Sequence, residues 1–351
     1  MLKLPGLIDS HTHLRDPGGT QKEDFDSGTA AALAGGFTII CAMPNTTPPI
    51  VDAASLAIAR HAAKTRARCD VGIYLGATPE NIPTAHTLAG QVAGLKMYLN
   101  GTFGTLKMEA MDAIIDHAAA WPADKPLLAH AEKHTCGIAI LAAHLAGRSI
   151  HICHVSRKEE ILLIARAKDK GMQVTCEACP HHMMLSTEDI PRIGAARADV
   201  RPVLASPADR AAIRAHIDVI DCFATDHAPH LLSEKDGTNP PPGYPGLETA
   251  LPLYLQLVRE GVIDLDGLVA RCHTNPRQIF GLADQEDTWV EVDEEAEWTL
   301  RGSDTHTRAK WSPWENTGLL GRVTRVVLRG SDAYRDGVVL APPGFGRNVS
   351  F

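Results

Sequence analysis

The chain has 351 residues, is 44% hydrophobic and carries a formal net charge of −8 at pH 7. This length suits one large α/β unit with a small addition, since α/β barrels commonly take about 250 residues as a single domain. The acidic balance argues against a nucleic-acid or membrane surface, and no apolar run reaches the roughly 18 residues that suggest a membrane span. The N-terminus lacks the apolar core of a signal peptide and the eight cysteines are scattered, so we expect reduced thiols in a cytoplasmic protein.

Short β-rich runs alternate with alanine-containing helical stretches along the first part of the chain. We expect strands at residues 5–14, 37–44, 69–75, 94–99, 126–131, 149–155, 173–178 and 220–225. Helices are expected at residues 20–34, 53–65, 106–120, 134–146, 157–170 and 247–260. Eight strands with intervening helices predict a closed (β/α)8 barrel of the TIM type over residues 1–282, rather than an open doubly wound sheet.

The alternation of strand and helix patterns ends after Leu282. Residues 288–292 and 322–329 have the pattern of antiparallel strands, and four tryptophans can supply packing, namely Trp289, Trp298, Trp311 and Trp314. We therefore expect residues 283–351 to form a small C-terminal β appendage packed on the barrel.

Residues able to bind a metal fall on six of the predicted barrel strands, most of them at the strand ends. They are His11, His13, Lys96, His130, Cys153, His154, Glu177 and Asp226. Barrel enzymes build their active sites at the C-terminal ends of the strands, so these side chains are expected to converge on one mouth. His11 and His13 can point together into the barrel, because residues i and i+2 of a strand face the same side.

Each of these residues alone has an ordinary structural explanation. A histidine at a strand end is more often a hydrogen-bonded core residue, and Lys96 within an apolar run could be a snorkelling side chain. The pair Cys176 and Cys179 fits a CxxC spacing but has no matching second pair, so we expect it not to bind metal. The joint pattern favours a site, because so many polar groups on barrel strands would be costly to bury without a purpose.

Imidazole, carboxylate and thiolate ligands indicate zinc rather than magnesium or calcium. An ammonium is a poor ligand, but a carbamate formed from Lys96 and carbon dioxide could bridge two ions. A two-metal site can provide a bridging hydroxide as nucleophile at neutral pH and polarise a carbonyl. Asp226 could bind metal and also act as general acid and base.

Several motifs resemble those of the dihydroorotases. They are PGLIDSHTHLR at 5–15, AMPN at 42–45, GLKMY at 94–98, HICHV at 151–155 and ATDHAPH at 224–230, and the likeness continues to VVLRG at 326–330 and PPGFG at 342–346. The resemblance is strongest to the dihydroorotase domain of the multifunctional animal protein that also carries carbamoyl-phosphate synthetase and aspartate transcarbamoylase. It implies reversible, zinc-dependent cyclisation of N-carbamoyl-L-aspartate to L-dihydroorotate in pyrimidine biosynthesis, a homodimer, and fusion to or assembly with those two enzymes.

The resemblance also implies ligand sets. One zinc would be held by His11, His13, carboxylated Lys96 and Asp226, and a second by Lys96, His130 and His154. A third would use His11, Cys153 and Glu177, so His11 would bind through both ring nitrogens.

On the substrate side, Arg15 lies just beyond the metal pair, where a guanidinium can form two bonds to the substrate carboxylate. Asn45, Arg201 and His230 are further candidate donors, and the backbone at Pro242 and Gly243 is expected to contact the ring. The resemblance places Thr102 and Phe103 in a lid that closes over the substrate, although the flanking glycines alone would equally support a plain turn.

Two other functions stay open at this point. A hydantoinase, dihydropyrimidinase or allantoinase would share the metals but would not need to bind a substrate carboxylate, which Arg15, Asn45 and His230 are suited to bind. A catalytically silent barrel kept as a scaffold inside a multienzyme chain would be expected to have lost metal ligands, whereas every ligand position here is filled.

Overall fold

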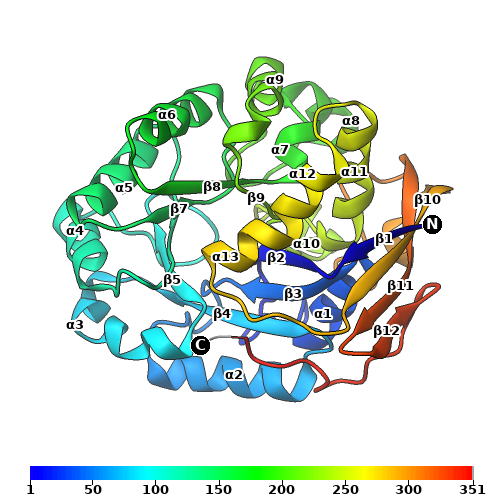
Figure 1. The fold of residues 1–351 in the computed structure, drawn as a ribbon, viewed down its shortest axis with the longest axis horizontal. Coiled ribbons are helices and arrows are strands. Elements are labelled where there is room, and N and C mark those ends of the chain that lie inside the picture. Colours follow the sequence, from blue (N-terminus) through cyan, green and yellow to red (C-terminus); the bar gives the residue numbers. More distant parts are fainter. Residues whose placement is uncertain (350–351) are drawn as a thin grey trace.

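Eight parallel strands form the barrel in the computed structural model, which describes residues 1–349 (Figure 1). Their order in the sheet follows their order in the chain, from β2 to β9. They are β2 (Leu7–Thr12), β3 (Phe37–Ala42), β4 (Asp70–Gly76), β5 (Gly94–Tyr98), β6 (Leu127–His130), β7 (Ile150–Ile152), β8 (Val174–Ala178) and β9 (Cys222–Phe223). Nearly every strand residue is buried, as expected for a sheet covered on both faces. The (β/α)8 prediction is confirmed.

The barrel closes between its first and last strands at the C-terminal mouth. Thr12 forms a parallel bridge with His227, and the His13 amide donates to the His227 carbonyl at 2.7 Å. Below this bridge the buried Asp9 carboxylate accepts from the Thr225 amide and hydroxyl. The seam therefore joins the two strand ends that carry the first and last predicted metal ligands.

Helices surround the strands (Figure 1). The main ones are α1 (Phe25–Ala34), α2 (Ala53–Arg66), α4 (Met111–Ala120), α5 (His134–Leu145), α6 (Lys158–Asp169), α9 (Pro207–Ala215) and α11 (Leu247–Arg259). Shorter helices are α3 (Ile82–Ala85), α7 (Pro180–Met184), α8 (Ile190–Ile193), α10 (Leu232–Lys235), α12 (Leu265–Val269) and α13 (Asn275–Ile279). None of the helices that the structure describes is long and apolar enough to cross a membrane.

Two predicted helices begin later than expected. The helix predicted from residue 20 begins at Phe25, because the Asp24 side chain accepts from the Ser27 amide and caps the helix there. The helix predicted from residue 106 begins at Met111, since Lys107 forms a bridge with Tyr98 and its segment stays extended. Both starts lie at the barrel mouth, where these segments serve as loops.

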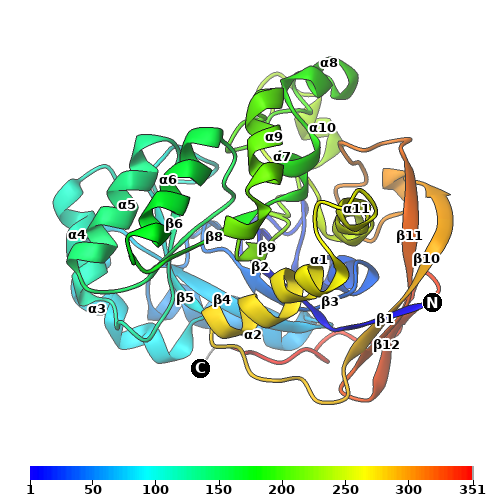
Figure 2. The same cartoon turned by 45° about the horizontal axis from the view of Figure 1, so that its top comes forward.

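A five-stranded antiparallel sheet stands beside the barrel (Figure 2). Its order is β1 (Leu2–Pro5), β10 (Trp289–Thr299), β11 (Gly318–Leu328), β12 (Ser331–Arg335) and β13 (Val338–Val339). The strand predicted over residues 5–14 is β2, which is shorter than expected, and the sequence interpretation missed β1, which belongs to this sheet and does not enter the barrel. A Cβ at Gly6 would meet Thr38 Oγ1 at 2.3 Å, so glycine lets the chain turn between the two sheets.

The last described residues return to the barrel, where Asn348 forms a parallel bridge with Val71 of β4. The tail also packs near the mouth, since Trp311 and Trp314 share a buried apolar cluster with Leu185 and Tyr244. All eight cysteines are free and buried, which agrees with the expectation of unpaired thiols.

Candidate active site

A small cavity at the C-terminal ends of the barrel strands collects most of the predicted site residues. It is lined by His11, His13, Arg15, Asn45, Tyr98, Thr102, Phe103, His130, His154, Val200, Arg201, Asp226, Ala228, Pro242 and Gly243. The remaining predicted ligands, Lys96, Cys153 and Glu177, are fully buried and lie beneath this group, in contact with one another or with His11. The residues chosen from separate strands therefore form one site.

His11 and His13 both face the carboxylate of Asp226. The Asp226 Oδ1 atom is 3.0 Å from His13 Nε2 and 3.4 Å from His11 Nε2. The other His11 nitrogen, Nδ1, contacts the Glu177 carboxylate, so both ring nitrogens of His11 face acidic groups. Ligand atoms of His11, His13 and Asp226 all lie within 4.8 Å of one another.

A second group of ligand atoms lies on the inner side of His11. Ligand atoms of His11, Cys153 and Glu177 also fall within 4.8 Å of one another. Lys96 Nζ lies 2.7 Å from Cys153 Sγ and so reaches this group from β5. His11 is the residue shared by both groups.

His130 and His154 form the third part of the site. His130 Nδ1 and His154 Nε2 are 2.9 Å apart, and the second nitrogen of His130 contacts the Glu132 carboxylate at 3.1 Å. His154 Nδ1 is buried and has no hydrogen-bond partner among the described residues. A buried imidazole nitrogen without a partner is costly, which suggests a missing partner such as a metal ion.

Three residues at the mouth adopt positive φ angles although none is glycine. These are Arg15 at 55°, His154 at 37° and Asp226 at 48°. Such conformations cost about 1–3 kcal/mol each and tend to occur where function requires a particular side-chain direction. Here each one redirects the chain just after a strand ends, which brings its side chain over the mouth.

Burial controls the ionisation of the site. It lowers the pKa of His11 to about 4 and keeps the pKa values of His13 and His154 well below their usual range. It also raises the pKa of Asp226. Burial alone would raise the pKa of Glu177, but His11 holds it well below its usual value. The result is neutral imidazoles next to a carboxylate, the state in which histidine binds metal.

These donors fit the predicted metals. Imidazole nitrogens, carboxylate oxygens and a thiol are the ligands that zinc takes in proteins. The orphaned His154 nitrogen and the His11 ring placed between two acidic groups are the arrangement that bound cations would complete.

The predicted substrate residues gather around the same cavity, and Arg15 is the one whose contacts reach His230. Arg15 donates through Nε to the Pro229 carbonyl at 3.2 Å, and its Nη2 lies 3.0 Å from His230 Nε2. Burial is the first cause that lowers the pKa of His230, with Arg15 the second, so its ring is neutral. Arg15 is itself buried and forms no ion pair with a carboxylate among residues 1–349, which leaves its charge available to an anion.

The segment predicted as a lid lies against Arg15 and His230. The guanidinium of Arg15 is 4.9 Å from the centre of the Phe103 ring, and the same ring packs edge-on against His230 at 5.0 Å. Asn45 donates to the Phe103 carbonyl at 2.9 Å and lies 2.7 Å from His13 Nδ1. Asn45 thus links the lid to the metal-ligand side.

Arg201 contacts the Asp199 carboxylate and so differs from Arg15 in being already paired. The loop with Pro242 and Gly243 reaches His230 through the Pro242 carbonyl at 3.0 Å. Gly243 has φ 141°, and a Cβ there would meet the Ala228 carbonyl at 2.4 Å, so no other residue fits. Five of the six predicted substrate residues therefore line the cavity, and His230 lies behind it, in contact with Arg15 and the Pro242 carbonyl.

The sequence interpretation missed several residues that hold the site together. Lys235 is fully buried, and its Nζ donates to the carbonyls of Asp199 and Pro241 at 2.9 Å each. The buried Glu23 accepts from Thr307 and contacts His227 at 3.3 Å. No spacing in the sequence could reveal these partners, since all of these contacts except the one with Pro241 join distant parts of the chain.

Cys179 lies with His181 and His182, and their ligand atoms are within 4.8 Å of one another. The adjacent histidines after Cys179 were the available signal for this group. Cys176, the other cysteine of the CxxC spacing, donates instead to the Val219 carbonyl at 3.5 Å. The two cysteines of the CxxC pair therefore do not share a site.

Comparisons with known proteins agree with this geometry. The model of the amidohydrolase family matches residues 2–285. The chain is 33% identical to a dihydroorotase of Pyrococcus furiosus over 97% of this chain and 83% of that protein. The chain belongs to the dihydroorotases of the amidohydrolase family. This dihydroorotase chain is also 53% identical, over 99% of its length, to the multifunctional protein CAD of Squalus acanthias, of which it spans only 16%.

Solved structures confirm the barrel. An L-hydantoinase from Arthrobacter aurescens superposes with a TM-score of 0.95 over the whole chain and 89% of that structure, at 23% identity, which shows the fold alone. An inactive dihydroorotase-like domain of the Chaetomium thermophilum CAD-like multifunctional protein gives a TM-score of 0.85 at 30% identity, with 99% of each chain covered. The relatives thus include an inactive domain.

Proposed function

We propose that this dihydroorotase family member interconverts N-carbamoyl-L-aspartate and L-dihydroorotate, a step of pyrimidine biosynthesis. The observation that carries the proposal is the pairing of two walls in one cavity. One wall holds clustered imidazoles with Asp226, and the other holds the buried, unpaired charge of Arg15 beside His230. The first suits amide chemistry and the second suits a ring that bears a carboxylate.

Zinc is the metal that the donors favour. His11, His13 and Asp226 would hold one ion and His130 and His154 another, with carboxylated Lys96 between them, and His11, Cys153 and Glu177 could hold a third. When bound, the zinc ions would supply an activated water and polarise the amide carbonyl. The buried position of all these donors supports this assignment.

The residues of the chain would transfer the proton, orient the substrate and exclude bulk water. Water adds across the ring amide, the ring C–N bond breaks, and the leaving nitrogen takes a proton. The raised pKa of Asp226 supports its role as the carboxylate that accepts the proton from water and delivers it to that nitrogen. Arg15 would orient the substrate carboxylate, and Thr102 and Phe103 would exclude water when the lid is closed.

A hydantoinase or dihydropyrimidinase is the second candidate, since such enzymes share this fold. Their name-giving substrates lack the ring carboxylate, so the buried guanidinium of Arg15 beside the neutral His230 ring would have no anion to bind. An inactive scaffold is the third candidate. Against it stands the retention of every predicted ligand, with two ligand groups each within 4.8 Å.

We further propose that the chain works as a homodimer in the cytoplasm and within a larger polypeptide or assembly that includes carbamoyl-phosphate synthetase and aspartate transcarbamoylase. The support is the match to multifunctional proteins, of which this chain spans about one sixth. Residues 1–282 would serve as the catalytic barrel and residues 283–351 as the packed appendage.

Metal analysis together with turnover of dihydroorotate in both directions tests the proposal. We expect bound zinc and reversible turnover. Arg15→Ala should raise KM for dihydroorotate steeply, whereas Arg60→Ala, which removes a half-buried arginine bonded to Gln91 far from the cavity lining, should change nothing. Zinc-loaded protein that hydrolyses dihydropyrimidines but not dihydroorotate would refute the substrate assignment, and protein without zinc or turnover would support the scaffold.

A further inference from the structure

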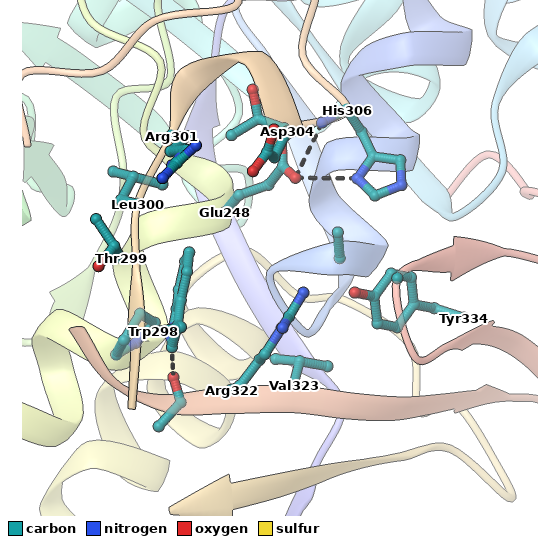
Figure 3. Close-up of a pocket in the computed structure, with 15 residues that line it drawn as sticks. Glu248, Trp298, Thr299, Leu300, Arg301, Asp304, His306, Arg322, Val323 and Tyr334 are labelled. Atoms are coloured by element: carbon teal, nitrogen blue, oxygen red, sulfur yellow. Dashed lines mark hydrogen bonds and ion pairs between the residues drawn. The ribbon is translucent and has the colours of Figure 1, made fainter. Parts of the chain in front are cut away.

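A second cavity lies away from the barrel mouth, between helix α11 and the antiparallel sheet (Figure 3). It encloses about 180 Å³. Its walls include Glu248 at the start of α11, Trp298 of β10, Arg322 of β11 and Tyr334 of β12, and the segment from Leu300 to His306 forms one side. None of these residues belongs to the proposed active site.

Two arginines in this cavity have no anionic partner. Among residues 1–349, neither Arg301 nor Arg322 makes an ion pair or a side-chain hydrogen bond. Arg322 rises between Trp298 and Tyr334, and its guanidinium is 5.7 Å from the centre of the Trp298 ring (Figure 3). Most of the other arginines that the structure describes are bonded to a carboxylate or a carbonyl, so this pair is unusual in facing an open space.

The acidic groups in the wall are already engaged. Glu248 accepts from the His306 and Thr307 amides at 2.8 and 3.1 Å and contacts His306 Nδ1 at 3.0 Å. This hydrogen bond raises the pKa of His306. Asp304 accepts from the Ser303 hydroxyl at 2.9 Å. Because a hydroxyl does not neutralise a carboxylate, Asp304 keeps its charge, and the two arginines outnumber this one wall carboxylate that has no ion pair among residues 1–349.

We propose that this cavity binds a small planar ring that carries a phosphate or a carboxylate. The Arg322 guanidinium, which lies at the Trp298 ring, would bind the anionic group, because its planar fork matches the oxygens of both anions, and Arg301 would add positive charge from another side of the cavity. The ring would lie against the Trp298 indole and near the Tyr334 ring, which offer flat apolar surface. The proposal is independent of the dihydroorotase assignment, since it uses no residue of that site.

Isothermal titration of the purified protein tests this inference, with phenyl phosphate and benzoate as the two probes. Inorganic phosphate supplies the anion without the ring, and phenol supplies the ring without the anion. We expect one of the two probes to bind more tightly than inorganic phosphate and more tightly than phenol. The probe that binds more tightly identifies the anionic group that the cavity prefers. The double variant Arg301→Gln/Arg322→Gln should lose about tenfold or more of that affinity, as for a lost charge-assisted pair.

Arg335→Gln is the matched control, since it removes an exposed arginine of β12 that contacts only Asp332. It should bind the probe as the unaltered protein does. Both variants should keep the melting temperature and the dihydroorotate turnover, because Arg301 and Arg322 are exposed. Failure of both probes to bind at millimolar concentration, or equal affinity in the double variant, would refute the site. If inorganic phosphate binds as tightly as phenyl phosphate, the proposed contact of a ligand ring with Trp298 and Tyr334 is refuted.

Discussion

Replacing Lys235 with methionine should loosen the wall of the active site that we assign to the substrate. The Lys235 ammonium joins two loops, because it donates to the Asp199 carbonyl, two residues before Arg201, and to the Pro241 carbonyl, next to Pro242. It also lies 5.6 Å from the centre of the Trp311 ring. Methionine fills a similar volume but donates no hydrogen bond, so both carbonyls would lose their buried partner.

The size of the effect follows from two opposing terms. A hydrogen bond from a charged donor contributes about 1.5–3 kcal/mol, so two contribute about 3–6 kcal/mol. Burial lowers the pKa of Lys235 from 10.5 to about 8, which corresponds to a cost of about 3 kcal/mol for keeping it charged. We therefore expect a net loss of up to about 3 kcal/mol of unfolding free energy, with roughly 2–4 °C in melting temperature per kcal/mol.

Steady-state kinetics and thermal unfolding measure the two consequences. KM for dihydroorotate should rise by about tenfold while kcat falls less, because the loops bind substrate and do not carry the proton. Lys310→Met is the control, since Lys310 donates to the Thr305 carbonyl, which lies outside the active-site cavity. An unchanged KM in Lys235→Met, with a lower melting temperature, would show that Lys235 supports the fold alone and would refute the reasoning.

The lowered pKa of Lys235 also predicts a pH dependence of stability. Between about pH 8 and pH 10.5 the unfolded chain binds more protons at this residue than the folded chain does. The contribution of Lys235 to stability should therefore rise with pH in that window. Denaturant midpoints of the unaltered protein and of Lys235→Met, compared at both ends of the window, measure it, and a constant difference would contradict the expectation.

Three further perturbations address the groups around the metal ligands. Asp9→Asn should lower kcat with little change in KM, because Asp9 accepts from the His11 amide and the Thr225 hydroxyl and aligns the barrel seam; equal kcat values would contradict this. Thr307→Val removes a bond to Glu23 worth about 1 kcal/mol, or about fivefold in rate if it positions His227, whereas Thr305→Val, which frees only the Gly302 carbonyl, should leave the rate unchanged. Chelation should abolish turnover and lower the melting temperature, and zinc should restore both; full activity after verified metal loss would rule out metal-dependent chemistry.

The sequence predicted the barrel and its mouth well, for a physical reason. Parallel strands buried on both faces produce apolar runs, and a polar residue at the end of such a run stands out. His11, His130 and Asp226 were each visible in this way, and the rule that barrel sites form at the C-terminal strand ends then placed them together. Local patterns sufficed because each predicted ligand lies on a barrel strand or directly after one.

The separation of β1 from β2 could not be predicted from such local patterns. The sequence predicted one strand over residues 5–14, and only the pairing of β1 with β10, almost 300 residues later, shows that Leu2–Pro5 forms a separate strand in another sheet. Lys235 was hidden for the same reason. A lysine near a proline-rich loop has the pattern of a solvated side chain, and its burial depends on Tyr244 and Trp311, which belong to other segments.

The tail contributes to the mouth as well as to the antiparallel sheet. Trp311 donates to the His230 carbonyl at 2.8 Å, and Thr307 reaches the buried Glu23 behind His227. The segment between β10 and β11 thus supports two residues of the barrel mouth, His230 directly and His227 through Glu23. Because that segment also borders the cavity with Arg301, a ligand bound there would touch the chain that supports His230 and His227. Any effect of such a ligand on turnover should therefore weaken in Thr307→Val, since this change removes one of the bonds that join the segment to the barrel mouth.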